Sequence, residues 1–139
     1  MADIVETAVN AGSFKTLLKA VDISGLTETI KSPGPYTIFA PTDDAFANLS
    51  QETLDSLLQN TEKLKRIVAY HIAFGDVRSD DLAQIDEAET VEGSVIAIES
   101  ANGKSKVNDA NIIKTDILAD NGVIHVIDVV LMPAILAGH

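Results

Sequence analysis

The chain contains no cysteine. This absence excludes disulfide bonds, thiol catalysis and zinc–thiolate sites. Basic residues are scarce, because 10 Lys and Arg stand against 21 Asp and Glu and give a net charge of −11. Nucleic acids and anionic membrane surfaces are bound mainly through Lys and Arg, so the charge balance argues against both as partners. The same acidity favours solubility and discourages self-association, and we expect a monomer.

Long hydrophobic runs are also missing. No stretch approaches the ~18 apolar residues of a membrane span, so we expect no membrane insertion. The N-terminus carries acids where a signal peptide needs a basic start and an apolar run, so the chain as given shows no leader. With 139 residues, the chain is long enough to bury roughly two-thirds of its unfolded surface. We therefore expect one domain, residues 1–139, that folds without a metal or a disulfide.

The common catalytic motifs are absent. The sequence has no G-x-S-x-G, no H-E-x-x-H, no P-loop and no G-x-G-x-x-G, and its eight glycines are scattered singly. The acidic pairs, such as Asp43-Asp44 and Asp80-Asp81, lack the spacing of an EF-hand and are interpreted as helix-terminal or solvated residues. The sequence therefore predicts a protein that is not an enzyme and that uses no cofactor and no metal.

Two histidines leave an alternative open. His71 lies on an apolar helical stripe, and His125 lies in an apolar strand, on the face opposite Asp128. As one interpretation, His71 and His125 bind a metal or a small ligand, or serve as the base of a hydrolase. As the other, both are core histidines with hydrogen-bond partners, because buried polar groups are normally paired. His139 is the terminal residue.

The first half of the sequence has the apolar spacing of short helices. The helical faces are formed by Ile4, Val5, Ala8 and Val9; Phe14, Leu17, Leu18 and Val21; Leu26 and Ile30; Phe46 and Leu49; Leu54, Leu57 and Leu58; and Leu64, Ile67, Val68 and His71. Gly12 and Gly25 are expected to end the first two helices. The expected N-caps are Ser13, Thr42, Ser50 and Thr61.

The second half has the pattern of strands. After a strand at 36–39, one helical turn is expected at 79–82, and then strands at 89–91, 94–99, 112–118 and 123–131. Asn102-Gly103 and Asn121-Gly122 predict hairpin turns with positive φ, so Gly122→Ala is expected to destabilise the fold. Because strands follow helices and do not alternate with them, the fold class is α+β.

Three segments together resemble the fasciclin family (fasciclin I-like domains), in a stand-alone, microbial form. The first runs from Thr37 through Phe39, Pro41 and Thr42 to Phe46; the second is Tyr70-His71; the third runs from Asn121 and Gly122 through His125 and Val126 to Pro133. Their order and separations fit the family over almost the whole chain. The first and third segments are also explained by folding, as a strand-to-helix corner and a strand that crosses the core.

The resemblance implies a wedge-shaped β-sandwich with several helices packed beside it. It also implies a non-enzymatic adhesion or matrix-binding module in an extracellular, periplasmic or cell-surface location, with a protein or a polysaccharide as partner. In animal members the Tyr-His region and a short Asp-Ile segment have been proposed as binding sites. The corresponding candidates here are Tyr70, His71, Asp116 and Ile117. A purely structural role, with assembly through exposed sheet edges, is a third hypothesis.

Leu64→Ala tests the assignment of the buried helical face. We expect it to lower the free energy of unfolding by ~2–5 kcal/mol, because it opens a cavity on that face. Urea denaturation of the wild type and the variant measures the difference. An unchanged melting temperature would show that the assigned face is wrong.

Overall fold

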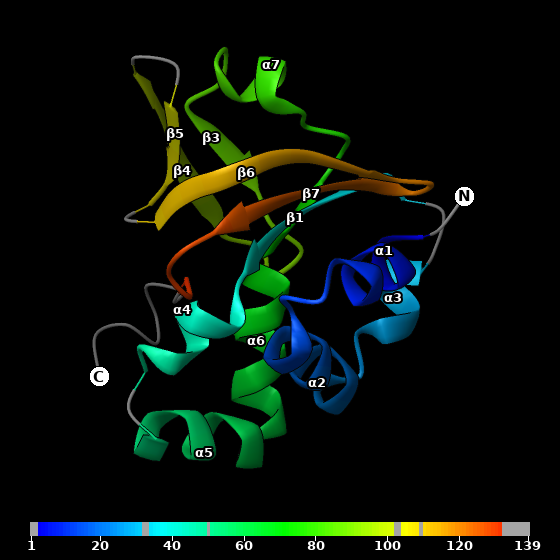
Figure 1. Ribbon diagram of the computed structural model, residues 1–139, viewed down its shortest axis with the longest axis vertical. Helices are drawn as coiled ribbons and strands as arrows, with labels where there is room; N and C mark the ends of the chain where they lie inside the picture. Colours follow the sequence, from blue (N-terminus) through cyan, green and yellow to red (C-terminus); the bar gives the residue numbers. More distant parts are fainter. Residues whose placement is uncertain (1–2, 32–33, 50, 102–103, 109, 132–139) are drawn as a thin grey trace.

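The computed structural model describes residues 3–31, 34–49, 51–101, 104–108 and 110–131. Helices occupy most of the chain before residue 71 and strands most of it afterwards, which confirms the α+β class (Figure 1). The helices are α1 (Ile4–Ala11), α2 (Lys15–Ser24), α3 (Thr27–Lys31), α4 (Asp43–Ala47), α5 (Gln51–Gln59), α6 (Thr61–Tyr70) and α7 (Ser79–Leu82). The strands are β1 (Tyr36–Pro41), β2 (Ile72–Phe74), β3 (Glu87–Glu89), β4 (Val95–Ala101), β5 (Lys104–Val107), β6 (Ala110–Ala119) and β7 (Gly122–Ile127).

The strands form one sheet in the order β2-β1-β7-β6-β5-β4-β3. β1 and β7 are parallel, and the other neighbours are antiparallel. The sheet curls until its ends meet, since Ala73 of β2 forms a bridge with Thr90, just after β3, and Val91 donates to the Ile72 carbonyl at 2.8 Å. The strands of the expected wedge therefore belong to a single, nearly closed sheet, in place of two separate ones.

Two hydrophobic cores lie on the two faces of β1 and β7. The helix-side core joins α1–α6 to one face, and Figure 1 shows these helices together on that side of the sheet. The inner core fills the curl of the sheet and consists of Phe39, Tyr70, Ala73, Leu82, Ile96, Ile98, Val107, Ala110, Ile127 and Leu131. Every residue of β7 is buried, which confirms cover on both faces for the apolar run as far as Ile127, whereas Val129, in the same predicted run, is 42% exposed. Within the described ranges, no helix combines the length and apolarity needed to cross a bilayer.

Several local predictions are confirmed. Gly12 and Gly25 end α1 and α2 in the left-handed conformation, and the hydroxyl of Thr42 accepts a hydrogen bond from Ala45 N at 3.1 Å as the N-cap of α4. α7 is the helical turn expected at 79–82. Leu64 is buried, so the face assigned to α6 is confirmed.

The N-caps of α2 and α6 differ from the prediction. Phe14 occupies the cap position of α2 without a side-chain bond, and the Asp43 carboxylate, 27 residues away, accepts from Thr16 N at 2.8 Å. A distant side chain thus replaces the predicted Ser13 cap. Asn60 caps α6 by accepting from Lys63 N at 3.2 Å, and the predicted cap, Thr61, is its first helical residue.

The boundaries of other elements also differ. Val9, placed on the buried face of α1, is 57% exposed because the helix end passes the edge of the core. β3 begins and ends two residues before the predicted strand, β7 ends at Ile127, and β2 and β5 were not among the predicted strands. β2 is too short, at three residues, to show a period. Predictions on Ser50, Asn102-Gly103, Pro133 and His139 lie outside the described residues.

Gly122 has a different structural role from the one predicted. Ala119 pairs with Gly122 across β6 and β7, so the turn consists of Asp120 and Asn121, and φ of Gly122 is outside the left-handed region. A Cβ atom at position 122 would lie 1.9 Å from the carbonyl oxygen of Tyr36 in β1. Glycine is required here because the two parallel strands approach closely at this point.

Substituting this glycine should therefore cost more than a simple backbone preference does. We expect Gly122→Ala to lower the free energy of unfolding by at least ~1–3 kcal/mol, the cost of overpacking a core. The matched control is Gly12→Ala, where φ is +80° but the added methyl group meets open space. Urea unfolding that shows Gly122→Ala to be no more destabilising than Gly12→Ala would contradict the close-approach explanation.

Candidate functional site

Tyr70 and His71 stand at the end of α6, where the sequence predicts them, but both side chains are inside the protein. Tyr70 is 5% exposed and His71 is 2% exposed. The Tyr70 hydroxyl reaches through the inner core and accepts a hydrogen bond from the Asn108 amide at 3.0 Å, in the β5–β6 turn. Neither side chain presents a contact surface in this structure, and both connect α6 to later parts of the chain.

The His71 ring is fixed by two backbone groups. Its Nδ1 lies 2.7 Å from the Ile67 carbonyl oxygen, and its Nε2 accepts a hydrogen bond from Leu131 N at 2.9 Å. An N–H group can only donate, so Nε2 carries no proton and Nδ1 is the donor. Burial lowers the pKa of His71 to about 4, while the hydrogen bond to Ile67 opposes that shift. The neutral ring therefore joins the end of α6 to the segment that follows β7.

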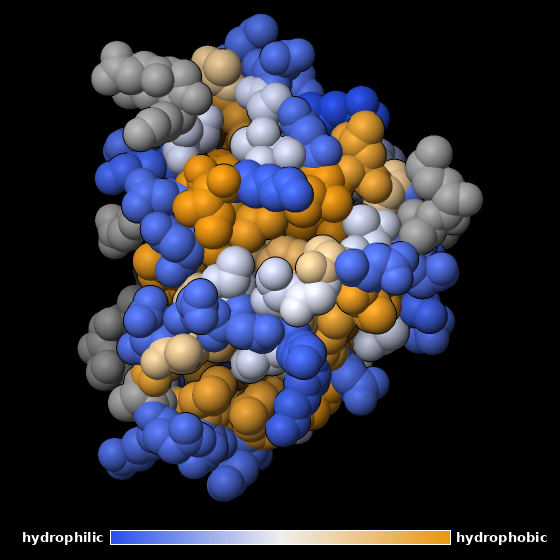
Figure 2. All heavy atoms as spheres, in the orientation of Figure 1, coloured by the Kyte–Doolittle hydropathy of each residue, from blue (hydrophilic) through white to orange (hydrophobic). Residues whose placement is uncertain are grey.

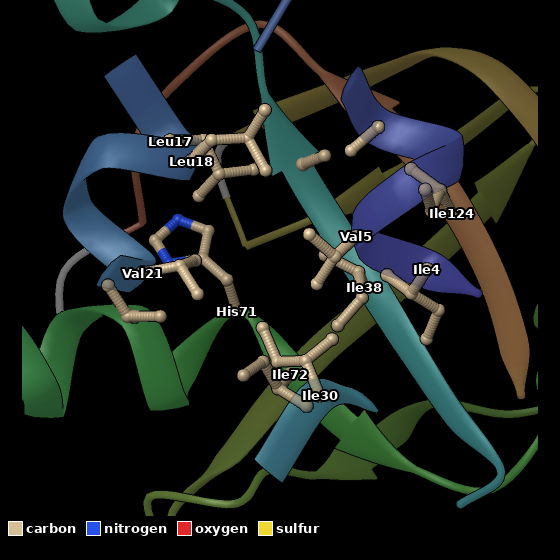
Figure 3. A pocket seen from close by; sticks show the side chains of 13 residues that line it. Ile4, Val5, Leu17, Leu18, Val21, Ile30, Ile38, His71, Ile72 and Ile124 are labelled. Atoms are coloured by element: carbon tan, nitrogen blue, oxygen red, sulfur yellow. The ribbon is translucent and has the colours of Figure 1, made fainter. Parts of the chain in front are cut away.

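Apolar side chains surround this ring. Figure 3 shows the His71 ring directed towards α2, beside Leu17, Leu18 and Val21. The cavity beside it has a volume of about 20 Å³, and a second one of about 10 Å³ also borders His71. Each has room for about one water molecule. Neither cavity can hold an organic substrate as the structure stands.

His125 is buried on the other face of the sheet. Its ring stacks on Phe39 of β1 with 5.7 Å between the ring centroids. Nε2 lies 2.6 Å from the Val77 carbonyl oxygen, and Nδ1 accepts from Asp116 N at 3.3 Å. Desolvation lowers the pKa of His125, and the hydrogen bond to Val77 works in the opposite direction. Both ring nitrogens are thus engaged by the backbone, as in His71.

The hydrolase or metal-binding alternative requires the two rings to converge. His71 borders Ile38 and Ile124, which face the helices, whereas the strand neighbours Phe39 and His125 face the opposite way. The two imidazoles therefore lie on opposite faces of the sheet, and this alternative lacks its geometry. Among the described residues, no three side chains of His, Asp or Glu gather where they could hold a metal ion.

The remaining family-motif residues make contacts that hold the fold together. Thr37 Oγ1 donates to the Gly75 carbonyl at 2.7 Å and accepts from Val77 N at 2.8 Å. The buried Asn121 side chain accepts from Ile4 N at 3.0 Å and donates to the Ile30 carbonyl, so it attaches α1 and α3 to the β6–β7 turn. The other members of the set, Phe39, Pro41, Phe46, Gly122 and Val126, are buried.

Asp116 is the exposed member of the predicted set. It lies at an irregularity of β6, with φ of 58°, and its carboxylate accepts hydrogen bonds from Ser79 N at 2.9 Å and from the Ser79 hydroxyl. Partial desolvation raises the pKa of Asp116, but the two bonds from Ser79, together with the nearby His125 and Arg78, lower the pKa overall. Ile117 is half-buried against the helix-side core. Asp116 therefore connects β6 to the start of α7 while its carboxylate remains accessible.

Two apolar residues near Asp116 were not predicted. Ile113 is 57% exposed and Leu118 is 48% exposed, both on β6. Figure 2 shows apolar atoms gathered over this strand, with polar atoms among them. We call Ile113, Asp116 and Leu118 the β6 surface. Strict alternation could not identify it, because two register shifts between Ile112 and Ile117 change which side chains face outwards.

The neutral state of His71 makes stability depend on pH. The unfolded chain binds a proton at this side chain below its ordinary pKa of 6.5, whereas the folded protein does so only near pH 4. The stabilisation is therefore complete above pH 6.5 and is lost as the pH falls towards 4, by roughly 3 kcal/mol. His71→Gln, which does not titrate, should show a shallower pH dependence in urea unfolding between these limits. Equal slopes for the two proteins would refute this, since His125 titrates in both.

Comparisons with known proteins agree with this architecture. The Fasciclin domain family model matches residues 12–133. An uncharacterised protein of Synechocystis, sll1735, is 46% identical over 132 residues, which cover 95% of this chain and 98% of that protein. Transforming growth factor-beta-induced protein ig-h3 of Sus scrofa is 32% identical over 133 residues, or 96% of this chain and 20% of that protein.

A solved structure shows the same fold. It contains a pair of FAS1 domains from the insect cell adhesion molecule fasciclin I, and the superposition covers 95% of this chain and 51% of that one. The TM-score is 0.79 at 19% sequence identity, so this likeness concerns the fold alone. Together with the family match over most of the sequence, it leads to one conclusion: the chain belongs to the fasciclin domain family.

Proposed function

We propose that this fasciclin domain is a non-enzymatic module that attaches to a protein or a polysaccharide at a cell surface or in a matrix. The observation that carries this proposal is the engagement of all four ring nitrogens of His71 and His125 by backbone groups. The two side chains best suited to acid–base chemistry are thereby committed to the fold. We therefore expect the domain to contact other molecules through its surface.

The relatives support an adhesive role. One relative with a solved structure is described as a cell adhesion molecule, and human periostin is 32% identical to this chain over 123 residues. The chain matches 15% of periostin, so it corresponds to one module of a longer protein there. We extend the adhesive role, and an extracellular, periplasmic or cell-surface location, to this chain by membership in the family.

The β6 surface is the part of the exterior that we assign to the contact. Ser79 and the irregularity of β6 hold the Asp116 carboxylate in a fixed orientation, so little conformational entropy is lost when a partner binds there. Each carboxylate oxygen accepts one bond from Ser79 and keeps a lone pair for a Lys, an Arg or a sugar hydroxyl. Ile113 and Leu118 add exposed apolar area on the same strand. Tyr70 and His71 are buried and contribute indirectly, by fixing the cores against which β6 packs.

Adhesion of domain-coated beads tests the proposal. We expect beads that carry the wild-type domain to bind cells or matrix of the source organism, and Ile113→Ser with Leu118→Ser to reduce the bound fraction at least tenfold. The matched control is Val9→Ser with Val95→Ser, two side chains of similar exposure at 57% and 51% outside the β6 surface. Circular dichroism checks that both variants are folded.

The outcomes separate the partner classes. Loss of adhesion after protease treatment of the cells identifies a protein partner, and loss after periodate oxidation identifies a polysaccharide. Wild-type beads that bind neither cells, matrix proteins nor polysaccharides would refute the adhesive function. Equal losses in both double variants would refute the assignment to the β6 surface.

A further inference from the structure

An open groove of about 370 Å³ lies away from the β6 surface. It is bordered by α6, by the loop between α2 and α3, and by the turn between β3 and β4. Its lining residues are Leu26, Lys65, Arg66, Ala69, Val91 and Glu92. Leu26 and Ala69 are buried and Val91 is half-buried, whereas Lys65 and Arg66 are exposed. The groove therefore combines an apolar floor with a charged rim, in the size range of ligand sites.

Among the described residues, the two cations of this rim form no ion pair, as is also true of Lys15 and Lys19 on α2. In the described ranges, the side chains of Lys65 and Arg66 make no hydrogen bond, and the salt bridge present there joins Asp76 to Arg78. Glu92 lines the same groove, but its carboxylate accepts a hydrogen bond from Ser94 N at 3.0 Å. Acidic side chains outnumber basic ones by 21 to 10 in this chain. Two adjacent cations at one groove are therefore a local departure from the acidity of the chain.

We propose that this groove binds an acidic segment of a partner protein, with an aliphatic side chain on the apolar floor and carboxylates against Lys65 and Arg66. Arg binds carboxylates through paired N–H donors, and acidic motifs are commonly recognised by such basic groups. Successive helix positions are rotated by about 100°, so the side chains of Lys65 and Arg66 point in different directions. They therefore suit carboxylates on both sides of the aliphatic side chain that covers the floor. The proposal rests on the proposed function, because it gives the adhesion module a second contact with a protein partner, in addition to the β6 surface.

The lining favours a peptide over an acidic polysaccharide. Sugar hydroxyls placed over Leu26, Ala69 and Val91 would lose their hydrogen bonds to water and find no partner on these side chains. The lining residues include no aromatic ring on which a sugar could stack. A Leu or Val side chain of a peptide needs no hydrogen-bond partner and no aromatic ring, and burying it against the apolar floor is favourable.

A peptide titration tests the groove directly. The probe is Ac-Gly-Asp-Glu-Leu-Glu-Asp-Gly-amide, added to the ¹⁵N-labelled domain in ~150 mM salt, where the Debye length of about 8 Å screens distant charges. We expect the amide signals of Leu26, Ala69 and Val91 to shift in a saturable manner. The control peptide, with Asn and Gln in place of Asp and Glu, should leave them unchanged. Shifts confined to other parts of the domain, or equal shifts with the control peptide, would overturn the proposal.

Charge reversal provides the matched pair of variants. Lys65→Glu with Arg66→Glu should weaken binding of the acidic peptide at least tenfold. Lys15→Glu with Lys19→Glu changes the net charge equally on α2, at exposed positions outside the groove, and should weaken it less than twofold. Equal weakening in both double variants would show that only the overall charge matters, and the groove would be ruled out.

Adhesion of the same variants separates this proposal from the proposed function. If wild-type beads adhere through a protein partner and Lys65→Glu with Arg66→Glu beads lose adhesion, both proposals are supported. If those variant beads adhere as well as the wild type, the groove is refuted as the partner site while the adhesive function stands. If wild-type beads adhere to nothing although the peptide still shifts the groove amides, the adhesive function is refuted and the peptide site stands.

Discussion

The parallel contact between β1 and β7 is the constraint on which the rest of the structure depends. It brings the two family segments side by side, with Tyr36 opposite Gly122 and Phe39 opposite His125. The backbones are so close at the first pair that a side chain at 122 has no space. Because successive strand residues face opposite ways, this register sends Ile38 and Ile124 to the helices and Phe39 and His125 into the curl of the sheet. Both cores therefore depend on one pairing.

The two histidines extend that constraint to the parts of the chain that have little secondary structure. His71 holds the segment after β7 through Leu131 N, and His125 holds the segment before α7 through the Val77 carbonyl. A neutral imidazole suits this task, because it offers one donor and one acceptor in a rigid ring. An aliphatic side chain at position 71 would leave two buried backbone groups without these partners, and one at position 125 would do the same to two partly buried groups. The position of both histidines within the segments that resemble the family is thus compatible with a purely structural role in this chain.

Features that depend on neighbouring residues could be predicted from the sequence, and those that depend on distant ones could not. The Thr42 cap, the left-handed Gly12 and Gly25 and the buried stripe of α6 each follow from a short window of residues. The α2 cap comes from Asp43, 27 residues away, and the support of Asp116 comes from Ser79, 37 residues away. The family resemblance located the right segments, but only the strand register shows why Gly122 is required or that Tyr70 and His71 are buried.

The groove also depends on distant residues, because Val91 and Leu26 approach α6 only in the folded chain. The positive charge of Lys65 and Arg66 is significant because the chain as a whole is acidic. A net charge of −11 repels acidic partners at long range, so contact there is favourable only where local cations exceed that repulsion. At physiological ionic strength distant carboxylates are screened beyond about 8 Å, while Lys65 and Arg66 act at contact distance. The acidic surface thus disfavours most anionic molecules, and the proposed groove site gains its specificity from the difference between local attraction and general repulsion.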